Sequence, residues 1–212
     1  MPVLASPALR VSPGGETSPE HAVRVVGILA LQGDFQAHAR IVRSLGAVAC
    51  EVRVPADLEG LDALIIPGGE STVMTLGIER EGLAEPLRAL VRAGTPVLGT
   101  CAGMIMLDRE HLGVLDVSTR RNAFGRQVRS FEADIDLSGV AGGPMHAVFI
   151  RAPWVASCGP DVEVLGRVED HPVAIRQGNM IAVSFHPELA GDGRLHEMLL
   201  ATNGTGADER RG

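Results

Sequence analysis

The sequence predicts an α/β fold with a largely parallel central sheet. In the first half of the chain, short apolar runs rich in β-branched residues alternate with segments of helical periodicity, and glycine-rich turns follow several of the runs. Strands that alternate with helices in this way are typical of parallel sheets with right-handed crossovers. The length of 212 residues suits one compact domain with a substantial core.

The first expected unit is a strand followed by a helix. Residues 23–31 form a β-branched apolar run, which is typical of a strand buried on both faces. A turn at residues 32–34 precedes a helical pattern that Gly46 ends. The apolar face of that helix consists of Phe35, Ala39, Val42 and Leu45.

The alternation continues to about Leu107. Further strands are predicted at residues 48–54, 61–66 and 95–99. One face of a helix is marked by Leu83, Leu87, Leu90 and Val91. A second helix is expected to begin at Cys101, directly after the strand that ends at Gly99.

The second half of the chain has a different pattern, with short strand-like runs that follow one another and predict antiparallel pairing. These runs are residues 128–135, 146–150, 162–168, 173–176 and 180–185. The last helix is predicted at residues 190–201. The sequence therefore combines a βα-type first half with a more antiparallel second half.

Domain boundaries follow from composition. Residues 1–22 contain four prolines and a Gly-Gly pair without periodicity, which predicts a disordered extension. An incorrectly assigned start codon would give the same pattern. Residues 23–201 are expected to form a single domain, and residues 202–212 a flexible tail.

Charge and composition limit the classes of partner. The formal net charge is −7, whereas nucleic acids and anionic membranes select for clustered positive charge. The chain has no apolar run of 18 residues and no basic segment followed by an apolar one at its N-terminus. We therefore expect a cytoplasmic protein that binds neither nucleic acid nor membrane, with a small molecule or another protein as its partner.

The numbers of cysteines and lysines limit the reactions that the chain can catalyse. Cys50, Cys101 and Cys158 are odd in number and widely spaced, which fits neither a disulfide framework nor a zinc or redox motif. All 19 basic residues are arginine. Chemistry that needs a lysine of this chain, such as Schiff-base formation, is therefore excluded.

The strongest chemical motif is Gly-Thr-Cys-Ala-Gly at residues 99–103. It stands where a strand passes into a helix and has the form of a nucleophile elbow with cysteine in place of serine. Flanking glycines are needed because the sharp turn brings neighbouring backbone close to the nucleophile. Cys101 is the candidate nucleophile, the alternative being a small buried apolar residue; Cys50 and Cys158 lack such a setting and are interpreted as structural.

A second motif, His-Pro-Glu at residues 186–188, follows a predicted strand. Pro187 favours extended geometry at His186, so the side chains of His186 and Glu188 should project to the same side. The carboxylate would hold the ring and leave its other nitrogen to take the thiol proton. A solvated pair or two metal ligands are the alternatives, but no further ligand stands at suitable spacing. His171 also precedes a proline, but it lacks the matching carboxylate.

The third motif is Pro-Gly-Gly-Glu-Ser at residues 67–71, at the end of a predicted strand. Open α/β sheets bind ligands at the carboxyl ends of their strands. The paired glycines would let a backbone N–H face an oxyanion, and Glu70 or Ser71 could contact a polar end of the substrate. An ordinary glycine turn is the alternative.

Taken together, the motifs resemble those of the class I (triad) glutamine amidotransferases, and among them the glutaminase subunits of pyridoxal phosphate synthase. The similarity spans about residues 25–200. The motifs are LALQG (29–33), PGGEST (67–72), RNAFGRQ (121–127), FIRAP (149–153) and SFHPEL (184–189), together with the Gly-Thr-Cys-Ala-Gly segment. Two departures concern the surface: the stretch from Leu107 to Leu115 is shorter than in the family, and the proline-rich extension is unusual.

The resemblance implies a three-layer α/β/α fold and hydrolysis of L-glutamine to L-glutamate and ammonia through a thioester on Cys101. His186 would move the proton and Glu188 would complete the triad, without a cofactor or metal. The oxyanion hole would use the backbone N–H groups of Gly69 and Ala102. The glutamine-binding residues implied are Gly69, Glu70, Ser71, Arg121, Ile150 and Arg151.

The resemblance also implies a partner, the lyase subunit of pyridoxal phosphate synthase, which would receive the ammonia for vitamin B6 biosynthesis. Two alternatives remain open at this point. The chain could be another class I glutamine amidotransferase subunit, or a catalytically silent partner protein of the same fold.

Overall fold

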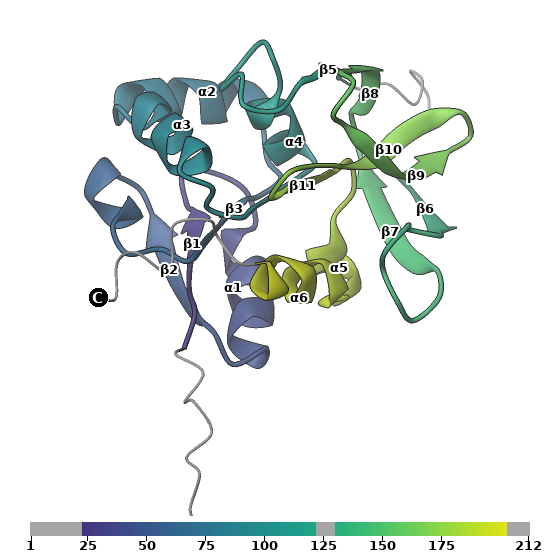
Figure 1. Cartoon of the computed structure of the whole chain (residues 1–212), viewed down its shortest axis with the longest axis horizontal. Coiled ribbons are helices and arrows are strands. Elements are labelled where there is room, and N and C mark those ends of the chain that lie inside the picture. The colour runs from purple at the N-terminus through teal and green to yellow at the C-terminus, as the bar shows by residue number, and fades with distance from the viewer. Residues whose placement is uncertain (1–22, 122–129, 203–212) are drawn as a thin grey trace, which may run out of the picture.

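The computed structural model describes residues 23–121 and 130–202. These residues form three layers, with helices on both faces of a seven-stranded sheet (Figure 1). The expected α/β/α fold is confirmed. The expected extension at residues 1–22, the tail from residue 203 and residues 122–127 of the RNAFGRQ motif lie outside the described residues.

The central sheet is parallel over most of its width. In spatial order its strands are β2 (Val48–Val52), β1 (Val25–Leu29), β3 (Ala63–Ile66), β4 (Val97–Thr100), β11 (Met180–Val183), β10 (His171–Gln177) and β9 (Glu163–Val168). From β2 to β11 neighbouring strands run parallel, whereas β10 and β9 add an antiparallel extension. β4 therefore lies in the middle of the sheet.

Two small antiparallel sheets stand beside the central one. They pair β5 (Val117–Arg120) with β8 (Trp154–Cys158), and β6 (Ser130–Ile135) with β7 (Met145–Ile150). Together with β9 and β10 they confirm the antiparallel character expected for the second half. The strands β6, β7, β9 and β10 form the green side of the molecule in Figure 1.

The helices divide between the two faces of the sheet (Figure 1). One face is covered by α2 (Ser71–Arg80), α3 (Ala84–Arg92) and α4 (Ala102–Leu107), and the other by α1 (Phe35–Ser44), α5 (Pro187–Ala190) and α6 (Arg194–Ala201). A 3₁₀ turn, η1 (Pro55–Leu58), follows β2.

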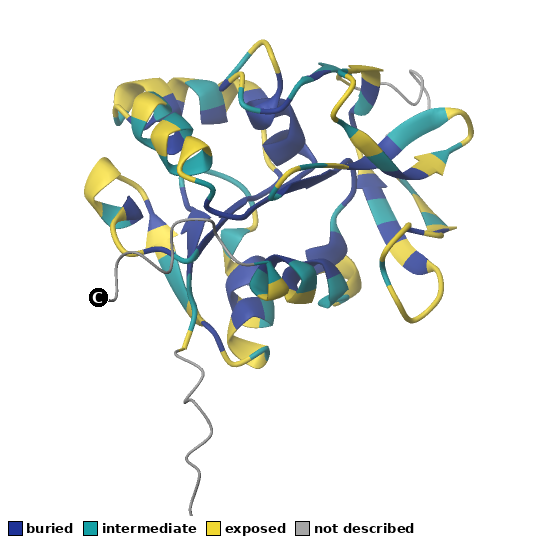
Figure 2. Ribbon diagram, viewed as in Figure 1, coloured by how far each residue is buried: buried dark blue, intermediate teal, exposed yellow. Residues whose placement is uncertain are grey.

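Two hydrophobic cores follow from the alternation of side chains along the strands. On β3, Leu64 and Ile66 pack towards α2–α4, whereas Ala63 and Ile65 pack towards α1 and α6. All four are fully buried. The sheet is accordingly dark through its centre in Figure 2, and exposed residues lie on the outer faces of the helices. This explains why the parallel strands have continuous apolar runs instead of alternating ones.

Three features differ from the sequence-based expectation. Helix α2 was not predicted, because it contains Gly77 and several β-branched residues that weaken a helical pattern. The strands β5 and β8 were not predicted either. The last helix was expected at residues 190–201, but Ala190 belongs to the separate helix α5, which Gly191 ends with a left-handed φ of 68°. Helix α6 then begins at Arg194.

We expect Gly103→Ala to lower the stability of the fold. A Cβ at Gly103 would overlap the backbone carbonyl oxygen of Ile66 on β3, so α4 would have to move away from the sheet. Overpacking of this kind costs about 1–3 kcal/mol, or a decrease of several degrees in the thermal midpoint. The matched control is Gly193→Ala, where the nearest atom would lie at 3.4 Å. Equal thermal midpoints for the two variants would contradict the close packing described here.

Candidate active site

The candidate site lies at the carboxyl edge of the parallel sheet. The strands β1, β3, β4 and β11 end at this edge, and each is followed by one of the motifs singled out in the sequence. These are Gln32-Gly33 after β1, Gly68-Gly69 after β3, Cys101 after β4 and His186 after β11. Open α/β sheets bind ligands at this edge.

Cys101 occupies the sharp turn between β4 and α4. Its backbone has φ 49° and ψ −107°, a conformation that residues with a side chain rarely adopt. The Cys101 N–H donates to the Val183 carbonyl of β11 at 2.8 Å. A Cβ on Gly99 would lie 3.0 Å from the Gly103 backbone. The glycines therefore allow α4 to start directly against the sheet, with the thiol at its first turn.

His186 and Glu188 lie together on the other side of Cys101. Pro187 begins α5, and the Nδ1 atom of His186 lies 2.7 Å from Oε1 of Glu188. The His186 N–H donates to the Val148 carbonyl of β7 at 2.9 Å, which fixes the backbone of the loop. The Cys101 side chain interacts with the ring as well, and this interaction raises the pKa of His186. The three side chains thus lie in the order cysteine, histidine, carboxylate.

Electrostatics favours a charged ring at His186. Burial acts to lower its pKa, but the hydrogen bonds and charges of Cys101 and Glu188 outweigh burial and raise the pKa to about 10. A histidine in this state forms an ion pair with an adjacent thiolate, which is the reactive form of cysteine. The arrangement therefore suits nucleophilic catalysis by Cys101.

A buried polar layer behind Glu188 was missed by the sequence analysis. Nε2 of His38, on α1, lies 3.4 Å from Oε2 of Glu188 and 3.2 Å from Oγ1 of Thr100. Thr100 Oγ1 in turn accepts the Gly68 N–H at 3.0 Å. On the far side, His38 Nδ1 lies 2.9 Å from Nε2 of His196 on α6. This layer connects the carboxylate with the glycine loop of β3.

The two histidines of this layer are uncharged at neutral pH. Both are fully buried, and burial lowers the pKa of each to about 4, although Glu188 acts in the opposite direction on His38. The available signal in the sequence was a histidine on the apolar face of α1, between Phe35 and Val42. That signal alone does not distinguish a site residue from a core residue.

A pocket of about 400 Å³ opens above Cys101, a volume within the usual range for small-molecule sites. It brings together every site residue expected from the sequence except Glu188, which lies behind His186 and is buried. Ile105 and Pro153 are further lining residues. The complete lining is Gly69, Glu70, Ser71, Cys101, Ala102, Ile105, Arg121, Ile150, Arg151, Pro153 and His186.

The polar rim of the pocket is fixed by local structure. Glu70 caps α2, and the N–H groups of Val73 and Thr72 hold the pKa of its carboxyl below the usual value. The Ile150 carbonyl accepts from Cys101 Sγ at 3.8 Å. Arg151 has a φ of 46°, a strained backbone conformation of the kind that clusters at functional sites.

The structure separates the alternative candidates from this pocket. His171 stacks on Trp154 with ring centroids 3.5 Å apart, and neither residue lines the pocket. Cys50 is on β2 at the edge of the sheet, and Cys158 is exposed at the end of β8. Cys101 is therefore the cysteine that meets both a histidine and a cavity.

Within residues 23–121 and 130–202, no group of three or more His, Cys, Asp or Glu side chains is placed to hold a metal ion. In the same part of the chain, no helix is both long and apolar enough to cross a membrane.

Comparison with known proteins identifies the family to which the chain belongs. Residues 28–203 match the model of the SNO glutamine amidotransferase family. The chain belongs to this family. The resemblance to the triad glutamine amidotransferases is thereby confirmed.

Individual relatives agree with the family. The chain is 54% identical over 184 residues to the pyridoxal 5'-phosphate synthase subunit PdxT of Frankia alni, covering 82% of this chain and 92% of the relative. It is also 54% identical over 199 residues to the protein of that name from Acidothermus cellulolyticus, covering 87% and 96%. A crystal structure of a glutamine amidotransferase matches with a TM-score of 0.78 at 48% identity, covering 82% of this chain and 96% of that one.

The buried histidine pair predicts a loss of stability in acid. The folded-state pKa of His196 is about 4, below the ordinary 6.5, so the unfolded chain binds more protons between these values. Its contribution to stability is therefore complete above about pH 6.5 and is lost as the pH falls towards 4. We expect His196→Gln to reduce the acid-induced loss of unfolding free energy by about 2 kcal/mol, measured by urea denaturation between about pH 7 and 4.5.

The control for this measurement is His146→Gln. His146 is exposed, and hydrogen bonds to Asp134 and Glu132 raise its pKa. Its contribution therefore has the opposite sign, being present below about pH 6.5 and lost as the pH rises. An equally steep acid loss in wild type and His196→Gln would show that the buried pair does not titrate as described.

Proposed function

We propose that the chain is the glutaminase subunit of a pyridoxal phosphate synthase. It hydrolyses L-glutamine to L-glutamate and ammonia and passes the ammonia to a synthase (lyase) partner that builds pyridoxal phosphate. The observation that carries the proposal is that Cys101 and His186 line one pocket of amino-acid size, with Glu188 Oε1 2.7 Å from the His186 ring and Cys101 acting to raise the pKa of His186. The names of the relatives, which are more than half identical to the chain, support the pathway.

The reaction begins with attack of the Cys101 thiolate on the side-chain amide carbon of glutamine. The developing oxyanion is stabilised by the backbone N–H groups of Gly69 and Ala102, two residues that line the same pocket as Cys101. His186 donates its proton to the departing ammonia, leaving a γ-glutamyl thioester. It then takes a proton from water, which hydrolyses the thioester and releases glutamate. Glu188 holds the ring in the orientation that both steps need.

The pocket rim suits the other end of glutamine. Free glutamine carries an α-carboxylate and an α-ammonium, which need a cation and hydrogen-bond acceptors respectively. Arg121 supplies the cation, and the Glu70 carboxylate faces the same pocket with its position fixed by the α2 cap. Ser71, Ile150 and Arg151 complete the set of proposed contacts.

A second protein is needed because this chain has no lysine. Assembly of the pyridoxal ring holds sugar phosphates as imines, which require a lysine amine. Ammonia released into bulk water would be diluted and protonated, so the two sites should be linked by a protected path. We also propose a cytoplasmic location, because Cys50, Cys101 and Cys158 are free thiols, which are typical of proteins in reducing compartments.

We expect Cys101→Ala to abolish ammonia release from glutamine, by at least ~10³-fold in kcat. The nucleophile is lost, while the smaller side chain leaves the elbow intact. The measurement is glutamate and ammonia formation in the presence of a pyridoxal phosphate synthase subunit, with the isolated chain as a second sample. Because the active site is expected to be fully organised only when the partner docks, activity is expected to be weak in the isolated chain and clearly higher in the mixture.

The matched control is Cys158→Ala, which removes an exposed thiol outside the pocket and should leave activity unchanged. Near wild-type activity of Cys101→Ala would rule out the proposed triad. Full activity of the isolated wild-type chain would contradict the coupling to a partner and leave the triad in place.

A further inference from the structure

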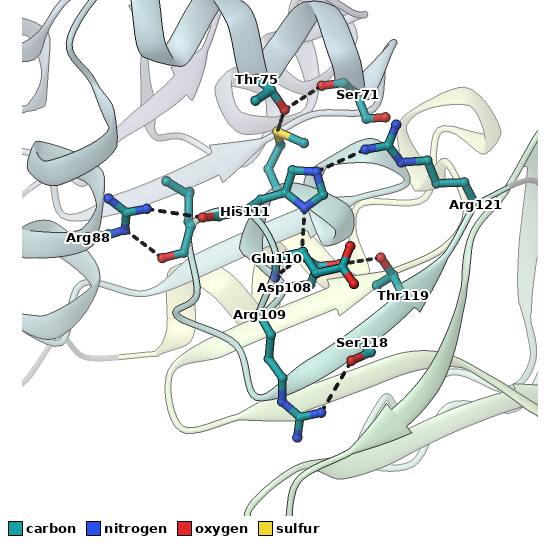
Figure 3. Close-up of polar contacts among 12 residues, drawn as sticks. Ser71, Thr75, Arg88, Asp108, Arg109, Glu110, His111, Ser118, Thr119 and Arg121 are labelled. Carbon is teal, nitrogen blue, oxygen red and sulfur yellow. Dashed lines mark hydrogen bonds and ion pairs between the residues drawn. The ribbon is translucent and has the colours of Figure 1, made fainter.

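A polar cluster lies beside the pocket, on the segment that follows α4 (Figure 3). It consists of Asp108 and His111 from this segment, Thr119 on β5 and Arg121 directly after β5. The triad mechanism does not use these residues, apart from Arg121 as the proposed carboxylate contact. The cluster forms one continuous chain of hydrogen bonds that ends at the pocket.

Asp108 is the fixed end of this chain. Its side chain is 1% exposed. One carboxylate oxygen accepts from Thr119 Oγ1 at 2.5 Å, and the other accepts from the Glu110 N–H at 3.0 Å and from the His111 ring. A buried carboxylate with three donors around it is held as an acceptor. Asp108 therefore ties the segment after α4 to β5 and imposes a direction on the hydrogen bond with His111.

The direction of that bond fixes the tautomer of His111. Its Nδ1 lies 2.7 Å from Asp108 Oδ1, and since the carboxylate accepts, Nδ1 carries the proton. In the neutral ring the other nitrogen, Nε2, is then an acceptor. That atom lies 3.1 Å from a terminal guanidinium nitrogen of Arg121, which can only donate. Figure 3 shows the ring between the two groups.

The backbone of His111 is fixed from the other side. Arg88 of α3 donates from Nε to the Leu112 carbonyl at 2.8 Å and from a terminal nitrogen to the His111 carbonyl at 3.2 Å. The His111 side chain is 13% exposed. The backbone of His111 is therefore fixed by α3, and its ring by Asp108, independently of the contact with Arg121.

The contact of Arg121 with the His111 ring suits a role of Arg121 in binding an anion. Among the described residues, no carboxylate lies within 4 Å of its guanidinium as an ion-pair partner, and Glu70, across the same pocket, acts on Arg121 only through a longer-range charge interaction. A carboxylate would anchor Arg121 but would also neutralise it and compete with an incoming anion. A neutral imidazole nitrogen orients one N–H and leaves the charge and the remaining donors available.

We propose that His111, oriented by Asp108, is a positioning residue that holds the Arg121 guanidinium at the pocket rim to receive the α-carboxylate of the substrate. This inference rests on the proposed glutaminase function. It assigns a role to the stretch between Leu107 and Leu115, which carries His111 to Arg121. Loss of His111 leaves the charge on Arg121 but removes its orientation, so substrate binding weakens while the chemistry at Cys101 continues.

The test is steady-state kinetics of the chain in complex with its synthase partner. His111→Ala is expected to raise KM for L-glutamine roughly 5–20-fold with kcat within about twofold. His111→Gln, which retains an acceptor, should recover most of the loss. Glu110→Ala, on the same segment but without a side-chain contact to Arg121, is the matched control and should behave as wild type.

A double-mutant comparison separates positioning from a general structural effect. In an Arg121→Ala background, His111→Ala should raise KM no further, because its effect passes through the guanidinium. Independent effects of the two substitutions, or a decrease in kcat at unchanged KM, would overturn the proposal.

Calorimetry on the complex containing Cys101→Ala gives a readout that does not depend on turnover. His111→Ala is expected to weaken L-glutamine binding by a factor similar to the KM effect. Equal affinity with and without His111 would overturn this inference alone. If the complex with His111 intact does not bind L-glutamine at all, the proposed function fails and the inference fails with it.

Discussion

Cys101 holds a left-handed backbone conformation between the central strand β4 and helix α4, and the rest of the site is arranged around that turn. The turn is possible because Gly99 and Gly103 let α4 begin against the sheet, where a Cβ at either position would meet backbone atoms. The strain at Cys101 is balanced by its hydrogen bond to β11 and by the packing of α4 in the larger core. The nucleophile therefore sits next to the middle strand of the sheet and a closely packed helix.

A second constraint on the site is that the carboxylate of Glu188 is buried. Glu188 is almost completely buried, and an isolated carboxylate there would be costly. One of its oxygens contacts His186, and the other faces His38, whose ring is neutral at ordinary pH. The triad histidine thus carries the positive charge, whereas Oε2 of Glu188 faces the neutral His38 ring at 3.4 Å and has no hydrogen-bond partner among the described residues. Arg121 is held in a similar way, because the neutral ring of His111 orients its guanidinium at the pocket without adding a second charge.

Much of this arrangement could be predicted from the sequence, because its signals are local. The apolar runs gave the strands, and the Gly-Thr-Cys-Ala-Gly and His-Pro-Glu segments indicated the nucleophile and its base through spacing alone. The parallel topology then explains why motifs more than 80 residues apart meet, since they follow strands that end at the same edge. Nine of the ten expected site residues line one pocket, and the tenth, Glu188, supports His186 from behind.

What the sequence did not reveal depends on tertiary contacts. Helix α2 has a weak helical pattern and is stabilised by the Glu70 cap and by packing on the sheet. His38 and His196 meet across 158 positions of the chain, and no local pattern distinguishes such a pair from two core histidines. His111 acquires its role only when α4, α3 and β5 converge on it. Each of these residues is defined by its neighbours in space, not by its neighbours in sequence.

The central claim is that Cys101 is the nucleophile because the fold gives it, and no other cysteine, a base and a pocket. The most direct measurement is labelling of the wild-type chain, in complex with its synthase partner, by a halomethyl-ketone analogue of L-glutamine, followed by peptide mass spectrometry and assay of residual activity. Modification should occur on Cys101, be slowed by L-glutamine and match the loss of glutaminase activity, while Cys50 and Cys158 stay unmodified. Inactivation that follows modification of another residue, or retained activity when Cys101 is fully labelled, would contradict the account.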